Sequence, residues 1–235
     1  MPQNGFHALI GAAVGRRVWP GRVPWVLGFI VGSMVPDVDI LPLAVLRLAG
    51  NWTEGIHRTA THSVFLIGVA FVTAGLGWKR SRVLGAFAFA LGLGVLGHIG
   101  LDLLLWFAGV NLLWPLSEIR GWREVNLWRG VKLPAVGGNP DFIGNELAAV
   151  NPLAFALYFG YLGRVARGAG VETRAVRFAR GVKMVCWGLF PVYAVTGVFL
   201  AEWGQSLVVY PLVIALFLPA ALAASIALRR PLAGG

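Results

Sequence analysis

The sequence has little charge and a single cysteine. Charged residues make up 13% of the 235 residues, about half of the roughly 25% usual in soluble domains. Hydrophobic residues reach 57%, and the mean hydropathy is +0.74. A soluble chain of this length could not bury so much apolar surface, and it would lack the charged surface that keeps proteins dispersed. The composition therefore predicts an integral membrane protein.

Further absences exclude other classes of protein. The single cysteine, Cys186, excludes an internal disulfide and any cysteine-rich metal site. Although the net charge is +10, no basic block is interleaved with aromatic residues and no nucleic-acid-binding motif occurs, so we expect no nucleic-acid partner. No Lys or Arg precedes the first apolar stretch, so we also expect no standard signal peptide.

Apolar runs of membrane-spanning length predict the fold class. We expect an all-α, polytopic helical bundle with six or seven membrane segments, the first two of them short or broken. The predicted segments are 5–15, Pro24 to Pro36 with a re-entrant piece over 40–49, 62–78, 83–108, 147–163, 184–202 and 207–228.

The positions of the basic residues predict the orientation. Placing the loops after the first, third and fifth segments and the residues after the last segment in the cytoplasm puts 14 of the 20 Lys and Arg residues inside, with one acid, Glu172. The N-terminus is then outside and the C-terminus inside, in a multi-pass protein of the cytoplasmic (inner) membrane. We divide the chain into a metal-site helical half (1–116), an extracytoplasmic interfacial loop (117–146) and a helical membrane scaffold (147–235).

The polar chemistry is confined to the first half of the chain. The last two predicted helices contain no Asp, His, Lys or Arg, which is typical of a scaffold. Ionisable residues within a membrane are costly, so a cluster of them indicates a functional site. The predicted orientation brings all four histidines and three aspartates to the outer third of the membrane: His7, Asp37, Asp39, His57, His62, His98 and Asp102.

The spacing of these residues favours a metal site. His98 and Asp102 are four apart on a predicted helix, so both leave one face and can bind one ion. Thr61 as an N-cap would place His62 in the first turn of its helix, with His57 on the preceding loop. The residues alone leave two alternatives open, a proton or ion pathway and a structural polar network.

The spaced motifs also resemble a known family. They are His7, Gly32 through Pro36-Asp37-Val38-Asp39, His57-Arg58 with Thr61-His62-Ser63, Gly97-His98 with Asp102, and Trp114-Pro115-Leu116-Ser117. Over residues 5 to about 117 the chain is similar to the YdjM-like, predicted membrane-bound metal-dependent hydrolases. The order His, Asp, His, His-x-x-x-Asp is distantly similar to the all-helical zinc-dependent phospholipase C group, which cleaves phosphodiesters.

The similarity to the phospholipase C group implies roles for these residues. Asp39 (or Asp37), His62, His98 and Asp102 would hold one zinc ion, and His7 would share a second ion with Asp102. The third metal of that group has no counterpart, because no histidine follows His98.

The predicted function is a membrane-bound hydrolase that uses zinc or another divalent metal, as one or two ions. Its substrate would be a phosphoester of a lipid or of a lipid-linked molecule at the outer leaflet. Asp37 or His57, whichever is not a ligand, would be the general base, and Arg58 would stabilise negative charge on a phosphate.

Arg120 and Arg123 in the interfacial loop would bind the phosphate-bearing head group, or would belong to an interfacial belt of aromatic residues and arginines. The alternative function is that of a non-enzymatic transporter or membrane organiser whose polar cluster is an ion pathway or a packing network.

Overall fold

The described part of the protein is helical. The computed structural model describes residues 4–50, 57–105, 109–120, 124–127, 150–202 and 209–234. Within these ranges no strand forms, and an isolated bridge joins Val110 to Val125. The prediction of an all-α fold is confirmed. The helices are α1 (Asn4–Val18), α2 (Val23–Gly32), η1 (Val35–Asp39), α3 (Ile40–Leu48), η2 (Ala60–His62), α4 (Val64–Arg80), α5 (Arg82–Leu105), α6 (Leu116–Arg120), α8 (Asn151–Gly168), α9 (Arg174–Glu202), α10 (Val209–Ala227) and α11 (Arg229–Ala233).

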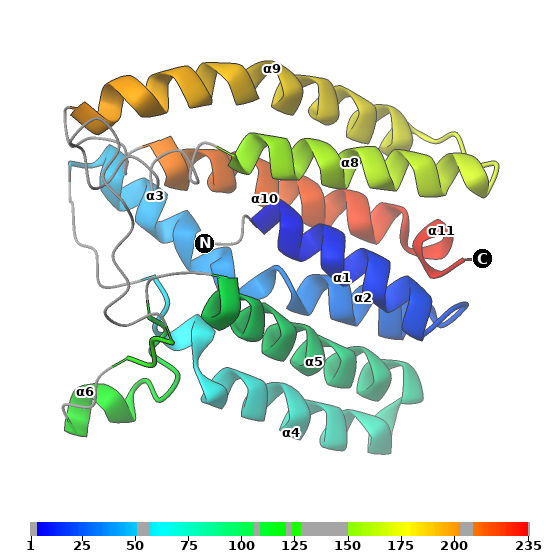
Figure 1. Ribbon diagram of the computed structural model, residues 1–235. Coiled ribbons are helices and arrows are strands. Elements are labelled where there is room, and N and C mark those ends of the chain that lie inside the picture. Colours follow the sequence, from blue (N-terminus) through cyan, green and yellow to red (C-terminus); the bar gives the residue numbers. More distant parts are fainter. Residues whose placement is uncertain are drawn as a thin grey trace.

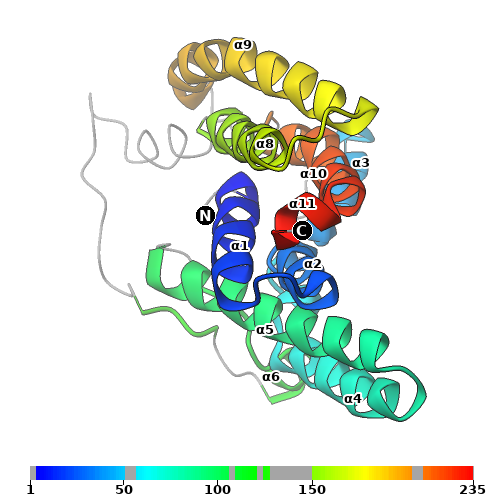
Figure 2. The same ribbon diagram turned by 90° about the vertical axis from the view of Figure 1, so that its right-hand side faces the viewer.

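The long helices run back and forth between the two ends of one bundle (Figure 1). Viewed along the bundle, α1 and α2 lie between the α4–α5 pair and a group formed by α8, α9 and α10 (Figure 2). The main apolar core joins α1 and α2 to the last part of the chain, because their buried residues pack with those of α8, α10 and α11; Ile30, Phe155 and Leu218 are examples. The first two helices therefore share a core with the last part of the chain.

Fewer helices of the described chain have the length and composition of a membrane span than the sequence predicts. Among the described residues, α5 is long and apolar enough to cross a membrane, and α2 with Val35–Leu46 forms a second candidate that is bent by 45°. The prediction of six or seven segments is therefore not confirmed by helix length and composition. The helices do overlap the predicted segments; α4 (Val64–Arg80), for example, contains most of the segment predicted at 62–78.

Glycines allow α2 and α5 to approach closely. A Cβ atom built on Gly32 would lie 2.1 Å from the carbonyl oxygen of Leu91, and one built on Gly94 would lie 2.4 Å from the carbonyl oxygen of Phe29. Such small residues are typical of contacts between membrane helices. The contact positions the end of α2 against α5, just before the turn of α5 that carries His98.

Replacing Gly32 by alanine should destabilise the protein by about 1–3 kcal/mol, because the two backbones must move apart to admit the methyl group. Thermal unfolding in detergent, followed by circular dichroism, measures the effect. Gly68→Ala is the matched control, because a Cβ at Gly68 of α4 meets no atom within 4 Å. Equal melting temperatures for the two variants would contradict the close contact.

Candidate metal centre

Several chain segments bring the polar residues to one end of the bundle. His7 lies in the first turns of α1, Asp37 and Asp39 in η1, His62 at the end of η2, and His98 and Asp102 in the last turns of α5. Because neighbouring helices alternate in direction, these helix ends meet at the end of the bundle marked N in Figure 1. All six side chains are buried, and His57, in the turn before η2, is partly exposed.

The ligand atoms form three overlapping groups that could hold a metal ion. Within each group the atoms lie within 4.8 Å of one another. The group that contains Asp37 shares His98 with one of the other groups and His62 with the other, so the cluster is one continuous site. The three groups are His7 with His98 and Asp102, Asp37 with His62 and His98, and Asp39 with His57 and His62.

Two imidazoles and two carboxylates converge at the centre of the cluster. The Nε2 atoms of His62 and His98 are 3.3 Å apart. Oδ1 of Asp37 lies 3.6 Å from each of them, and Oδ2 of Asp102 lies 3.5 Å from the first and 3.7 Å from the second. Ligands about 2.0–2.2 Å from a tetrahedral zinc ion are about 3.3–3.6 Å apart. Each of these five separations is therefore compatible with two ligands of one tetrahedral ion.

The two carboxylate oxygens that point to this centre lack hydrogen bonds. Oδ1 of Asp37 and Oδ2 of Asp102 are buried and have no hydrogen-bond partner among the described residues. Nδ1 of His98 donates to the carbonyl oxygen of Ser33 over 2.8 Å, which leaves the lone pair of Nε2 directed to the centre. Burying carboxylate oxygens without a partner is costly. A cation at the centre would compensate both.

Asp39 lies on the other side of His62 and is fully bonded. Its Oδ1 accepts a hydrogen bond from Nδ1 of His57 (2.8 Å), and its Oδ2 accepts one from Oγ1 of Thr61 (2.6 Å). Because the hydroxyl proton of Thr61 points to Asp39, Oγ1 can accept from Nδ1 of His62, 3.1 Å away. Asp39 thus orients both histidines, whereas Asp37 supplies the oxygen at the centre.

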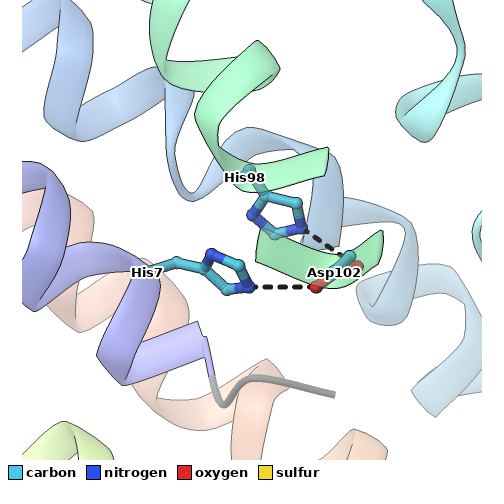
Figure 3. A group of neighbouring side chains, drawn as sticks. All are labelled: His7, His98 and Asp102. Carbon is cyan, nitrogen blue, oxygen red and sulfur yellow. Dashed lines mark hydrogen bonds and ion pairs between the residues drawn. The ribbon is translucent and has the colours of Figure 1, made fainter. Parts of the chain in front are cut away.

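Two residues of α1 contact the outer oxygens of the central carboxylates. Nε2 of His7 lies 3.2 Å from Oδ1 of Asp102, and the His7 ring stacks on His98 with 3.7 Å between centroids (Figure 3). Nδ2 of Asn4 donates to Oδ2 of Asp37 over 2.9 Å. His7 thus reaches Asp102 from the side opposite His62, where the two residues could share a second ion.

The turn before His62 is fixed by the segment after α5. Arg58 adopts a left-handed conformation with φ of 66°, which is strained for a residue with a side chain. Its backbone nitrogen donates to Oδ2 of Asp39 (3.1 Å), and its carbonyl oxygen accepts from the nitrogen of Asn111 (3.2 Å). The nitrogen of Val64 donates to the carbonyl oxygen of Leu112 (2.9 Å). The turn is therefore held from both sides.

Three carboxylates face the ring of His62. Its Nε2 lies 3.6 Å from Oδ1 of Asp37 and 3.5 Å from Oδ2 of Asp102, and its Nδ1 lies 3.6 Å from Oδ2 of Asp39. The cluster therefore attracts positive charge, and a metal ion would compete with the proton for His62.

The outcome for the other predicted residues is mixed. His57 lies in a turn before η2, as predicted, so His57 and His62 do not share a helix. The prediction of Thr61 as a helix N-cap is wrong, because α4 begins at Val64 and Thr61 lies in η2, bonded to Asp39. Arg120 is exposed at the end of α6. Arg123 lies outside the described residues.

The sequence reasoning missed three residues that support the cluster. The first is Asn4, whose side-chain amide donates a hydrogen bond to Asp37. The second is Ser33, whose carbonyl oxygen accepts one from His98. The third is Asn111, whose backbone nitrogen donates one to the carbonyl oxygen of Arg58. Asn4 precedes His7 by three positions, so its place on the same face of the first helix was a usable signal. The contact of Ser33 uses a backbone oxygen that every residue type has, so the sequence does not indicate it.

Comparison with known proteins identifies the family of the chain. No curated protein and no solved structure matches the chain, so the distant similarity to the phospholipase C group stays a prediction. A family model described as YdjM inner membrane protein matches residues 1–204, well beyond the motifs in the first half. The chain therefore belongs to the YdjM inner membrane protein family.

Proposed function

We propose that this inner membrane protein is a metal-dependent hydrolase that acts on a phosphoester of a lipid or of a lipid-linked substrate at the outer leaflet. The observation that carries the proposal is the approach of two buried histidine nitrogens to each other and to two buried carboxylate oxygens, at N–N and N–O separations between 3.3 and 3.7 Å. Two buried carboxylate oxygens at the centre of the cluster have no hydrogen-bond partner among the described residues, and a cation would compensate their charge.

Zinc is the proposed ion. A set of two imidazole nitrogens and two carboxylate oxygens in tetrahedral arrangement suits zinc, and another divalent metal could take its place. The proposed ligands are Asp37, His62, His98 and Asp102, with Asp39 in an orienting role. Asp37 takes the place that the sequence assigned first to Asp39, because the free oxygen of Asp37 faces both ligand nitrogens.

The proposed chemistry is hydrolysis. A divalent ion held by these residues supplies a Lewis acid that polarises a phosphoryl oxygen and acidifies water. Since Asp37 is assigned as a ligand, the general base is His57, whose ring is oriented by the 2.8 Å bond to Asp39. Arg58, next to His57 and only partly buried, provides a fixed positive charge for a phosphate.

The proposed substrate follows from the place of the site. The ligands lie at the end of apolar helices, where head groups of membrane lipids are found. Of the described cluster, the side near His57 and Arg58 is the more exposed, so we place substrate entry there. Arg120 is an additional contact for the head group. Arg123 is assigned the same role, on the basis of the sequence.

The proposed orientation rests on the basic residues. Figure 1 shows the α1–α2, α4–α5 and α8–α9 turns and α11 at the end of the bundle opposite the cluster. Basic residues favour the cytoplasmic side, so the cluster faces outward. The basic residues at that end are Arg16, Arg17, Arg22, Lys79, Arg80, Arg82, Arg164, Arg167, Arg174, Arg177, Arg229 and Arg230.

The arrangement favours this proposal over a proton or ion pathway. A pathway across the membrane needs polar groups at successive depths, and transporters bind near the midplane. In the part of the chain that the structure describes, all the buried Asp and His side chains belong to the cluster at one end. A structural polar network remains the competing interpretation, and metal analysis separates the two.

The ligand assignment predicts that the Asp37 and Asp39 variants differ in metal content. Purified wild type should contain at least one zinc ion per chain after reconstitution, and Asp37→Asn, His98→Ala and Asp102→Asn should lose most of it. Asp39→Asn should keep the ion with about 10- to 100-fold weaker affinity, as is usual for residues that orient ligands. Mass spectrometry of the metal, on variants with wild-type helicity, measures this. Wild type without metal, or full metal in both His98→Ala and Asp102→Asn, would leave the polar network as the explanation.

The role of His57 predicts a separation of metal binding from activity. His57→Gln should retain metal but lower the hydrolysis rate about 10²- to 10⁴-fold, the usual contribution of a general base. The assay is phosphate or alcohol release from phospholipid vesicles and from an aryl phosphodiester, with and without chelator. Leu216→Met, at an exposed position of α10, is the control that should keep both properties. Metal-loaded wild type that hydrolyses neither probe would refute the hydrolase.

The proposed orientation predicts which cysteines react from outside. In a Cys186→Ala background, Arg120→Cys in α6 should react with a membrane-impermeant maleimide in intact cells. Thr173→Cys, between α8 and α9, should react only after the membrane is permeabilised. The reverse pattern would place the cluster on the cytoplasmic side.

A further inference from the structure

The two central aspartates each have an inner and an outer oxygen. The inner oxygens, Oδ1 of Asp37 and Oδ2 of Asp102, face the two histidine nitrogens. The outer oxygens accept hydrogen bonds from the side chains of Asn4 and His7, respectively. A carboxylate can bind a metal through one oxygen or through both. The outer contacts favour binding through one oxygen.

Both outer partners come from a single face of α1. Asn4 and His7 are three residues apart, so their side chains lie on the same side of the helix, and both are fully buried. Gly5, between them, packs against α8 so closely that a Cβ there would lie 2.4 Å from the backbone of Ala154. The position of α1 is therefore fixed where it contacts the carboxylates.

We propose that Asn4 is a positioning residue that, together with His7, holds the metal-binding aspartates in one-oxygen coordination and so keeps coordination positions open. The inference rests on the proposed metal site. With four ligands of one atom each, a divalent ion can take up water or a phosphate oxygen by expanding from four to five coordination positions. If both aspartates bound through two oxygens, protein atoms would fill six positions, and an incoming oxygen would have to displace one of them.

The positioning role proposed for Asn4 requires a side chain that donates a hydrogen bond. The amide Nδ2 donates, and only a donor can hold Oδ2 of Asp37 without competing for the cation. Alanine at this position leaves Asp37 free to rotate, and aspartate places a second acceptor against its oxygen. Both changes should move Asp37 toward coordination through two oxygens or out of the site.

Cobalt(II) replaces zinc in the test because its visible absorption is strong in four-coordinate sites and weak in sites of higher coordination number. We expect wild type to give the strong spectrum and to change it when inorganic phosphate is added. Asn4→Ala and Asn4→Asp should bind Co²⁺ about 10- to 100-fold more weakly, with lower absorption per bound ion and a smaller response to phosphate.

The matched control is Ser225→Ala, which removes a buried hydrogen bond of 2.6 Å to Tyr158 between α10 and α8. It should lower the melting temperature and leave the affinity and spectrum of Co²⁺ unchanged, so a loss of stability alone cannot explain the expected result. Each variant is compared at wild-type helicity, and Asn4→Asp, which is nearly isosteric, replaces Asn4→Ala if the smaller residue does not fold.

The outcomes separate this inference from the proposed function. If wild type binds Co²⁺ and both Asn4 variants show the wild-type affinity and spectrum, the positioning role is wrong while the metal site stands. If wild type binds no Co²⁺ or Zn²⁺ at all, the metal site fails and the positioning role fails with it.

Discussion

The structure depends on how the charge of two buried carboxylates is compensated. Asp37 and Asp102 lie almost completely out of solvent, each with one oxygen that has no hydrogen-bond partner among the described residues. In a medium of low dielectric constant, such oxygens are destabilising unless a cation or a donor faces them. The nearest groups are the ring nitrogens of His62 and His98, at 3.5 to 3.7 Å, longer than hydrogen bonds and suited to ligands that surround an ion. The other polar contacts around the site can be understood as holding these four side chains in place.

The arrangement of the helices brings these four side chains together from segments that are far apart in the sequence. Alternating helix directions bring the start of α1, the end of α2 with η1, the start of α4 with η2, and the end of α5 to the same end of the bundle. Glycines set the distances, since Gly32 lets α2 approach α5 and Gly5 lets α1 approach α8. The second half of the chain carries none of the cluster residues, yet it forms the wall against which α1 is packed. It therefore contributes to the geometry of the site through α1.

Much of the cluster could be predicted because spacing on a regular helix determines direction. His98 and Asp102 are four apart on α5, and the structure places both at the centre. The choice between Asp37 and Asp39 could not be predicted, because the two lie in a short 3-10 helix on either side of His62. The cap predicted at Thr61 failed because the chain makes a separate turn before α4. Asn4 could have been predicted as well, because it lies three positions before His7 on the same face of the first helix.

The division between rigid and irregular segments fits a division of tasks within the proposed hydrolase. His98 and Asp102 lie on a continuous helix, and His7 lies on a second helix packed against α8; such positions hold ligands to a narrow geometry. His57 and Arg58 lie on a turn, and this turn is held by backbone bonds from Asn111 and Leu112 rather than by a helix. Metal ligands must converge on one point, whereas groups that contact substrate must face outward. A turn that is fixed at both sides allows a group to face outward in a defined orientation. It keeps His57 bonded to Asp39 and leaves His57 on the more accessible side of the cluster.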